Sequence, residues 1–244
     1  MESIYIGLTG KNSYVFGTND IYGTKNSECA IARINRHCGA LIVTAKGDFL
    51  IRLNKILEEC FENLSIEEEG ISIDLAKKII HYLEEHFRKD SKFKSNPLPF
   101  LLLLVGFNLE NSERIEHIFL RHRVIKIEEV KNKKIYTTQF DFQEPVCETD
   151  LFYGFSELSE YISGQILEKN AELEKVMRSV YFSLVQTQQM DSSLLPGIRM
   201  ATLSESNGFE WVDEKVLDQI SNQTEKLCKK LKGEMQTFLK SEAK

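Results

Sequence analysis

The feature that most constrains the fold is a β-hairpin pattern at the start of the sequence. Apolar and other residues alternate over residues 4–9, residues 10–13 (Gly-Lys-Asn-Ser) supply a turn, and residues 14–16 resume an apolar strand. A strand so near a chain end must be held inside a sheet, because loose ends otherwise fray. The sequence therefore predicts a sheet that incorporates its first segment.

Composition favours one globular domain, with room for an appendage. The chain has 244 residues, 42% of them hydrophobic, and its charges of both signs are interspersed, so it can bury a sizeable core. A net charge of −6 gives no electrostatic footprint for nucleic acid, and no run of Lys and Arg indicates a membrane surface. We therefore expect a protein partner or a small substrate, and neither nucleic acid nor membrane.

The longest apolar run is too short for a bilayer span, and the cysteines favour a reducing compartment. Residues 98–107 are about half the length of a bilayer span and contain Pro99 and Gly106, which favours a buried strand. The first residues show no signal-peptide pattern. Five cysteines without a C-x-x-C pair are typical of reduced, mostly buried thiols in a cytosolic or nuclear protein: Cys29, Cys38, Cys60, Cys147 and Cys228.

Two helices are expected after a second pair of strands. The strands cover residues 30–34 and 40–44, and a helix opens at Gly47 with Asp48 as its N-cap. Ser72 is the predicted cap of the next helix, whose apolar residues repeat at helical spacing. Two antiparallel helices would cover one face of a sheet.

The rest of the chain alternates between strands and helices. Expected strands are 100–107, 115–121, 124–130 and 135–142; expected helices are 158–167, 173–184 and 213–240; a short hairpin joins 198–203 to 209–211. This order of elements predicts an α+β fold in which two sheets lie between helix pairs.

Several short motifs resemble landmarks of proteasome β subunits, which have the N-terminal-nucleophile hydrolase fold. They are Ile6-Gly-Leu-Thr-Gly10 followed by Tyr14-Val15, then Gly47-Asp48, Leu101-Leu-Leu-Leu-Val-Gly-Phe107 and Tyr153-Gly154. The resemblance covers about residues 1–211 and implies a four-layer αββα sandwich of two antiparallel sheets. Residues 212–244 are then a C-terminal helical extension.

Within that family the chain looks most like the non-catalytic β subunit at ring position four, the beta type-2 class. The short segment before the first strand and the combination of residues 6–8 with 103–107 carry this likeness. It implies a structural role in the 20S core particle, in ubiquitin-dependent and general protein degradation. The implied partners are the other β subunits of a heteroheptameric ring, the adjacent α ring and the opposite β ring, in cytoplasm and nucleus.

The same resemblance implies that the nucleophile is lost. Active members use a threonine whose free α-amine acts as the base for its own hydroxyl. That position falls on Ser3, whose nitrogen we expect to remain an amide because Met1-Glu2 precedes it without a propeptide. The family's supporting Asp aligns with Asn19, while Asp20 points to the other face of the strand.

The supporting lysine of the family is also missing, because its position aligns near Ala30, in the segment that leads to Gly39. Asp191-Ser192 matches a second Asp-Ser support of active members and is expected to be a remnant of the site. We therefore assign no catalytic, cofactor-binding or metal-binding residue. The alternatives are an active amidohydrolase or homo-oligomeric protease that uses Ser3, and a free-standing interaction protein with this fold.

Histidines do not form a recognisable metal site. His81 and His86 are five residues apart on one helix and are expected to be solvated, because no H-E-x-x-H motif is present. His117 and His122 are predicted to lie in a strand and a turn, with surface or subunit-contact roles. The acidic run 67–69 is interpreted as a solvated linker.

Two further features leave the site prediction unchanged. The glycines of the first hairpin, Gly7, Gly10 and Gly17, are not at a strand-to-helix turn, so no phosphate loop is predicted. The final helix carries an apolar stripe at helical spacing. That stripe either packs on its own domain or embraces a neighbouring subunit.

Overall fold

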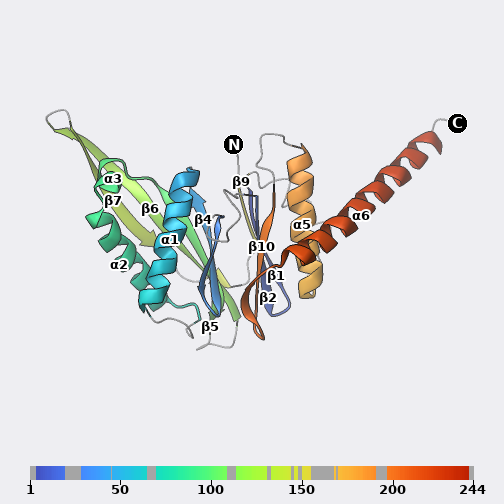
Figure 1. Ribbon diagram of the computed structural model, residues 1–244, viewed down its shortest axis with the longest axis horizontal. Coiled ribbons are helices and arrows are strands. Elements are labelled where there is room, and N and C mark those ends of the chain that lie inside the picture. Colours follow the sequence, from blue (N-terminus) through green and yellow to red (C-terminus); the bar gives the residue numbers. More distant parts are fainter. Residues whose placement is uncertain are drawn as a thin grey trace.

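Two antiparallel sheets pack face to face, with helices on their outer faces, in the computed structural model of this chain (Figure 1). The structure describes residues 4–19, 29–44, 46–64, 70–108, 114–130, 133–143, 146–147, 150–154, 168, 170–190 and 197–241. The α+β class with two antiparallel sheets is confirmed. Predictions for residues 3, 20, 67–69, 158–167 and 191–192 lie outside the described residues.

The first sheet contains the predicted N-terminal hairpin. Its strands run in the order β11-β10-β2-β1-β9. They are β1 (Ile4–Gly10), β2 (Ser13–Thr18), β9 (Leu151–Gly154), β10 (Arg199–Ser204) and β11 (Gly208–Trp211). The hairpin turns at Lys11 and Asn12, and Asn12 has φ 48°, a left-handed conformation that asparagine tolerates. Because β1 pairs with β2 on one side and β9 on the other, the first segment is an inner strand, as predicted.

Side chains of β1 alternate between two cores. Ile4, Ile6 and Leu8 pack beneath helix α5 (Leu173–Met190), whereas Tyr5 belongs to the core between the sheets. This alternation follows from the two-residue period of a strand. Both faces of the first sheet are therefore buried.

The second sheet has the strand order β3-β4-β5-β6-β7, and β8 pairs with β6. These strands are β3 (Ile31–Asn35), β4 (Cys38–Thr44), β5 (Phe100–Asn108), β6 (Arg114–Val130), β7 (Lys133–Phe142) and β8 (Val146–Cys147). The prediction of two strands over 115–130 was wrong, because β6 is one strand of 17 residues. An irregularity between Val124 and Lys126 lets it continue without a turn.

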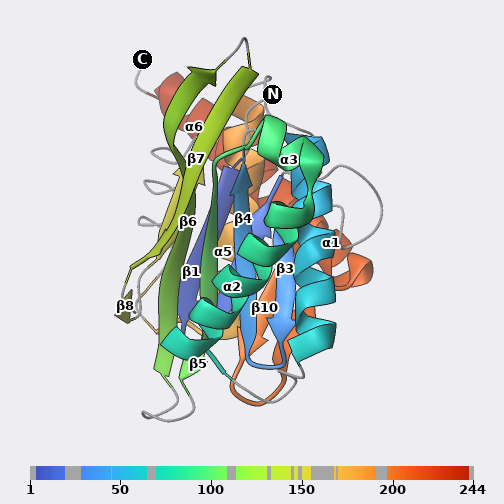
Figure 2. The same ribbon diagram turned by 90° about the vertical axis from the view of Figure 1, so that its left-hand side faces the viewer.

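Helices α1 (Gly47–Leu64), α2 (Ile73–Lys89) and α3 (Ser91–Ser95) cover the outer face of the second sheet (Figure 2). The Ser72 cap is confirmed, since its Oγ accepts a hydrogen bond from Leu75 N at 3.0 Å. Asp48 is not an N-cap. Helix α1 begins at Gly47, and the carbonyl of the preceding residue, Lys46, accepts a hydrogen bond from Leu50 N. Asp48 therefore lies inside the first turn.

Helix α5 covers the outer face of the first sheet at very close range. A Cβ added at Gly17 of β2 would lie 2.3 Å from Val180 of α5, so only glycine permits this approach. Helix α6 (Glu214–Ser241) starts against α5 and then extends away from the sandwich (Figure 1). Val216 and Leu217 of α6 pack on the same core as α5, so the first part of the helix packs on its own domain.

Candidate functional site

The end of the sandwich where β1 begins is organised by Asn19. The backbone N–H of Ile4 donates to Asn19 Oδ1 at 2.6 Å, and Asn19 N–H donates to the Ile4 carbonyl at 3.4 Å. Asn19 is fully buried. An amide side chain here carries no charge, so it fixes the backbone of β1 without supplying a carboxylate.

Ala30 is also fully buried, directly before β3. The segment is held by Asn54 of α1, whose Nδ2 donates to the carbonyls of Cys29 at 2.9 Å and Ile31 at 3.1 Å. Ala30 offers only a methyl group, so position 30 provides no ammonium to depress the pKa of a nearby nucleophile. The predicted site residues Ser3, Asp20 and Asp191-Ser192 lie outside the described residues.

A buried pair of side chains between the sheets was not predicted: the ring centroids of Tyr14 and His117 are 5.1 Å apart. Asp150 is exposed, and its Oδ1 accepts a hydrogen bond from Thr9 N at 2.8 Å. Burial, followed by the charge of Asp150, raises the pKa of Tyr14 well above its usual value. Partial desolvation of its carboxyl group raises the pKa of Asp150. The prediction that His117 is a surface residue was wrong, because β6 turns it inward against Tyr14.

The other strand histidine, His122, is buried as well, which corrects its predicted place in a surface turn. It lies on the face of β6 that α2 and α3 cover, opposite to the face of His117, and packs among phenylalanines of α2, α3, β5 and β7. Of the two helix histidines, His81 is exposed, as predicted, whereas His86 is half-buried, with its ring centroid 6.1 Å from that of Phe87. Over the residues that the structure describes, no group of three or more His, Cys, Asp or Glu side chains could hold a metal ion.

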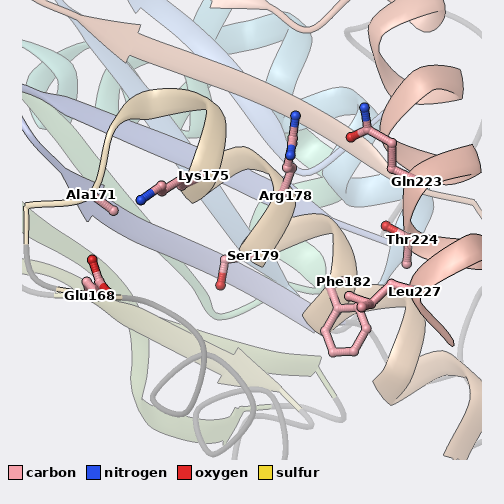
Figure 3. A pocket seen from close by; sticks show the side chains of 9 residues that line it. All are labelled: Glu168, Ala171, Lys175, Arg178, Ser179, Phe182, Gln223, Thr224 and Leu227. Carbon is pink, nitrogen blue, oxygen red and sulfur yellow. The ribbon is translucent and has the colours of Figure 1, made fainter. Parts of the chain in front are cut away.

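A cavity of about 480 Å³ lies between helices α5 and α6 (Figure 3). Lys175 and Glu168 stand at one end, and Phe182 and Leu227 lie together at the other. Ser179 Oγ lines the cavity, is buried and has no hydrogen-bond partner. A serine nucleophile needs a hydrogen-bonded base, so this hydroxyl is not activated for catalysis.

A second cavity, of about 560 Å³, lies between helices α2 and α3 and the strands β6 and β7. Its lining includes Phe87, Phe93, His122 and Phe140. Sequence reasoning missed it, since its walls come from segments that are distant in the chain. The available signal was the alternation Arg121-His122-Arg123, which is typical of a strand with one covered face and places His122 on the face opposite to the two arginines.

Comparison of the sequence with models of known protein families gives no match, and a search of curated proteins finds no significant relative. None of the helices in the described part of the chain has the length and apolar character needed to span a membrane.

Proposed function

We propose that this chain is a non-catalytic, structural β-type subunit of a 20S proteasome core particle. The observation that carries the proposal is the arrangement of the first sheet. The strand that starts at Ile4 is an inner strand, and the two sheets lie between helices on both outer faces. This arrangement is what the N-terminal-nucleophile hydrolase fold of proteasome β subunits requires, and the motifs of the sequence resemble that family.

The chemistry of two described positions supports a structural role. Active members of the family use a carboxylate and an ammonium group to activate the nucleophile. Here Asn19 is a neutral amide engaged with the β1 backbone, and Ala30 is a buried methyl group. Neither carries a charge, so neither can lower the pKa of a hydroxyl as an ammonium group does. The proposed subunit therefore contributes ring wall and interface, and its neighbours carry out peptide hydrolysis.

Native mass spectrometry of the protein isolated from its own cells tests this proposal. We expect a four-ring particle that contains one copy of this chain in each β ring. Flanking β subunits and an α subunit should co-purify with it. A homo-oligomer of chains trimmed to Ser3 would overturn the proposal in favour of an active hydrolase, and a free monomer would overturn it in favour of a free-standing interaction protein.

Substitution of Ser3 by alanine in the purified particle provides a second test. We expect unchanged peptidase activity, because the proposed subunit does not supply a nucleophile. Alanine at the threonine nucleophile of a catalytic neighbour is the matched control and should abolish that neighbour's activity. Loss of one peptidase activity in Ser3→Ala would contradict the structural role.

A further inference from the structure

The cavity between α5 and α6 is lined by one face of each helix (Figure 3). Its lining on α5 includes Lys175, Arg178 and Phe182, which follow one another at intervals of three and four residues. Its lining on α6 includes Thr224 and Leu227, which are three residues apart. Residues at these intervals lie on the same side of a helix. The two faces therefore meet across one space, and a single molecule in it can contact both helices.

This space is not filled by its own walls. Its volume is about 480 Å³, which lies within the range of small-molecule sites. Phe182 is half-buried, and Leu227 is 47% exposed, so both still offer apolar surface to a ligand. Ser179 also lines the cavity, but its Oγ is fully buried, and we assign it no contact with a ligand.

The charged side chains of the lining favour a ligand with one negative charge. Lys175 is exposed and forms no ion pair or side-chain hydrogen bond with the residues that the structure describes. Arg178 is paired with Glu174, and Glu168 is the acidic residue among the described lining side chains. Two cations and one anion around a cavity attract a single carboxylate. A phosphate group carries about two negative charges at neutral pH, which is more than this balance supports.

Thr224 adds a hydrogen-bonding group from α6. The residue is 7% exposed, and its hydroxyl forms no hydrogen bond with any described residue. Its oxygen is not fully buried, in contrast to that of Ser179, and Figure 3 shows it on the side of α6 that faces α5. A hydroxyl that is mostly removed from water and lacks a partner is costly. A carboxylate oxygen in the cavity would accept its hydrogen bond.

We propose that this cavity binds an amphipathic monocarboxylate of the medium-chain fatty acid class. The carboxylate contacts Arg178 and accepts a hydrogen bond from Thr224, and the charge of Lys175 supports it. The alkyl chain covers Phe182 and Leu227, which lie together at the apolar end of the cavity. The inference does not rest on the proposed function, because the cavity belongs to one chain and its ligand can be tested without an assembled particle.

An NMR titration of the isotope-labelled full chain with octanoate tests the inference. Octan-1-ol is the control that keeps the chain and lacks the charge, and acetate keeps the charge and lacks the chain. We expect octanoate to bind with a dissociation constant of about 1 mM or tighter. The amide signals that move should belong to α5 and α6. Octan-1-ol should bind at least about fivefold more weakly for the loss of its charged contacts, and acetate should not saturate the site.

Variants of the chain separate the two ends of the ligand. Lys175→Glu should weaken octanoate binding by roughly three- to tenfold, the effect of reversing one exposed charge. It should leave octan-1-ol binding unchanged. Lys55→Glu, the same change at an exposed position of α1, should alter octanoate binding less than twofold. Leu227→Ser should weaken octanoate and octan-1-ol alike, because both lose contact with the chain.

Thr224→Val replaces the hydroxyl by a methyl group of nearly the same shape. It should weaken octanoate binding by about fivefold for the loss of one hydrogen bond. The same variant should bind octan-1-ol as the wild type does or more tightly, since the cavity becomes more apolar. Equal weakening of both ligands would remove Thr224 from the carboxylate contact and contradict the assigned orientation.

Three further results would overturn the inference. The first is no saturable binding of octanoate below about 10 mM. The second is equal affinity for octanoate and octan-1-ol, which would leave an apolar groove without a recognised head group. The third is an equal effect of Lys175→Glu and Lys55→Glu, which would reduce the attraction to net charge. Native mass spectrometry of the particle reads none of these quantities, so failure here and failure of the proposed function are distinguishable.

Discussion

The interior between the two sheets and the projecting β6–β7 ribbon differ in how their apolar side chains are packed: the interior is close-packed, and the ribbon is exposed to solvent. Between the sheets, Phe16 is fully buried, with its ring 5.8 Å from that of Phe209. A Cβ added at Gly39 would lie 2.6 Å from Phe209, so no space remains. On the ribbon, Ile127 is 60% exposed. Stability thus resides in the interior, while the ribbon presents Ile127 to solvent.

This contrast shows that apolar residues occupy interior positions and ribbon positions for different physical reasons. An interior residue is required by its neighbours, since close packing leaves no alternative shape. An exposed isoleucine on a ribbon is not fixed by such packing, so its replacement should cost little stability. Four substitutions test how sharp this division is.

The largest effect is expected at Phe16. Phe16→Ala removes a ring from the contact between the sheets and should lower the free energy of unfolding by about 3–5 kcal/mol. Urea denaturation followed by circular dichroism measures this loss. A loss below roughly 1 kcal/mol would mean that the sheets do not depend on this contact.

A smaller loss is expected at Asn19. Asn19→Leu leaves the buried N–H of Ile4 without its acceptor and should cost about 1–3 kcal/mol. Asn207→Leu, in an exposed turn, is the control and should stay within about 0.5 kcal/mol of the wild type. Equal losses in the free energy of unfolding of the two variants would mean that Asn19 does not hold the start of β1.

A pH-dependent effect is expected at His122. Burial lowers its pKa in the folded chain, so below about pH 6.5 the unfolded chain binds a proton that the native chain does not. Stability should therefore fall as the pH drops from about 6.5 towards the lowered folded pKa, and this contribution should be fully present above about pH 6.5.

His122→Phe should reduce that slope in urea titrations between about pH 5.5 and 6.5. It should not abolish the slope, because the pKa of His37 is also lowered, by burial and then by Arg36. Asp150, whose pKa is raised by burial, is present in both the wild type and His122→Phe. Its contribution to the pH dependence of stability is therefore the same in both and does not affect the difference between the two slopes. An unchanged slope in the variant would show that His122 is hydrated or charged in the native state.

The smallest effect is expected on the ribbon. Ile127→Ala should change the free energy of unfolding by no more than about 0.5 kcal/mol, because the side chain already faces solvent. The same urea experiment measures it. A loss near that of Phe16→Ala would erase the distinction between the two regions.

Elements with a clear local signal could be predicted from the sequence. The N-terminal hairpin has strict alternation and turn residues, and Ser72 precedes an amphipathic helix. In both cases a few neighbouring residues are enough to determine the local structure. The buried run 100–107 is likewise the central strand β5. Where the local pattern and the global fold agree, sequence reasoning succeeds.

The break in β6 was predicted because three basic or polar residues, 121–123, look like a turn. In the structure Arg123 pairs with Asp141 of β7, and His122 faces the phenylalanines. A strand that leaves the sandwich can carry charged residues on one face, so polarity alone did not mark an end. The short elements α3, β8 and β9 were missed because tertiary pairing, rather than local periodicity, defines them.

The candidate sites were harder to predict for the same reason. Asn19 and Ala30 were identified through resemblance to a family, whereas the cavity at His122 is assembled by four elements that only the fold brings together. No local spacing rule describes such a set.

The first sheet also has a consequence for synthesis. Strands β1 and β2 come from the beginning of the chain, and their partners β9, β10 and β11 come from its second half. During translation β2 stays without its partner β10, and the side chains of Ile4, Ile6 and Leu8 stay without their cover, until β10 and α5 have left the ribosome. Such long-range pairing is slow and exposes apolar surface to aggregation. The apolar row of β1 therefore stays without its native cover in a chain that ends before α5.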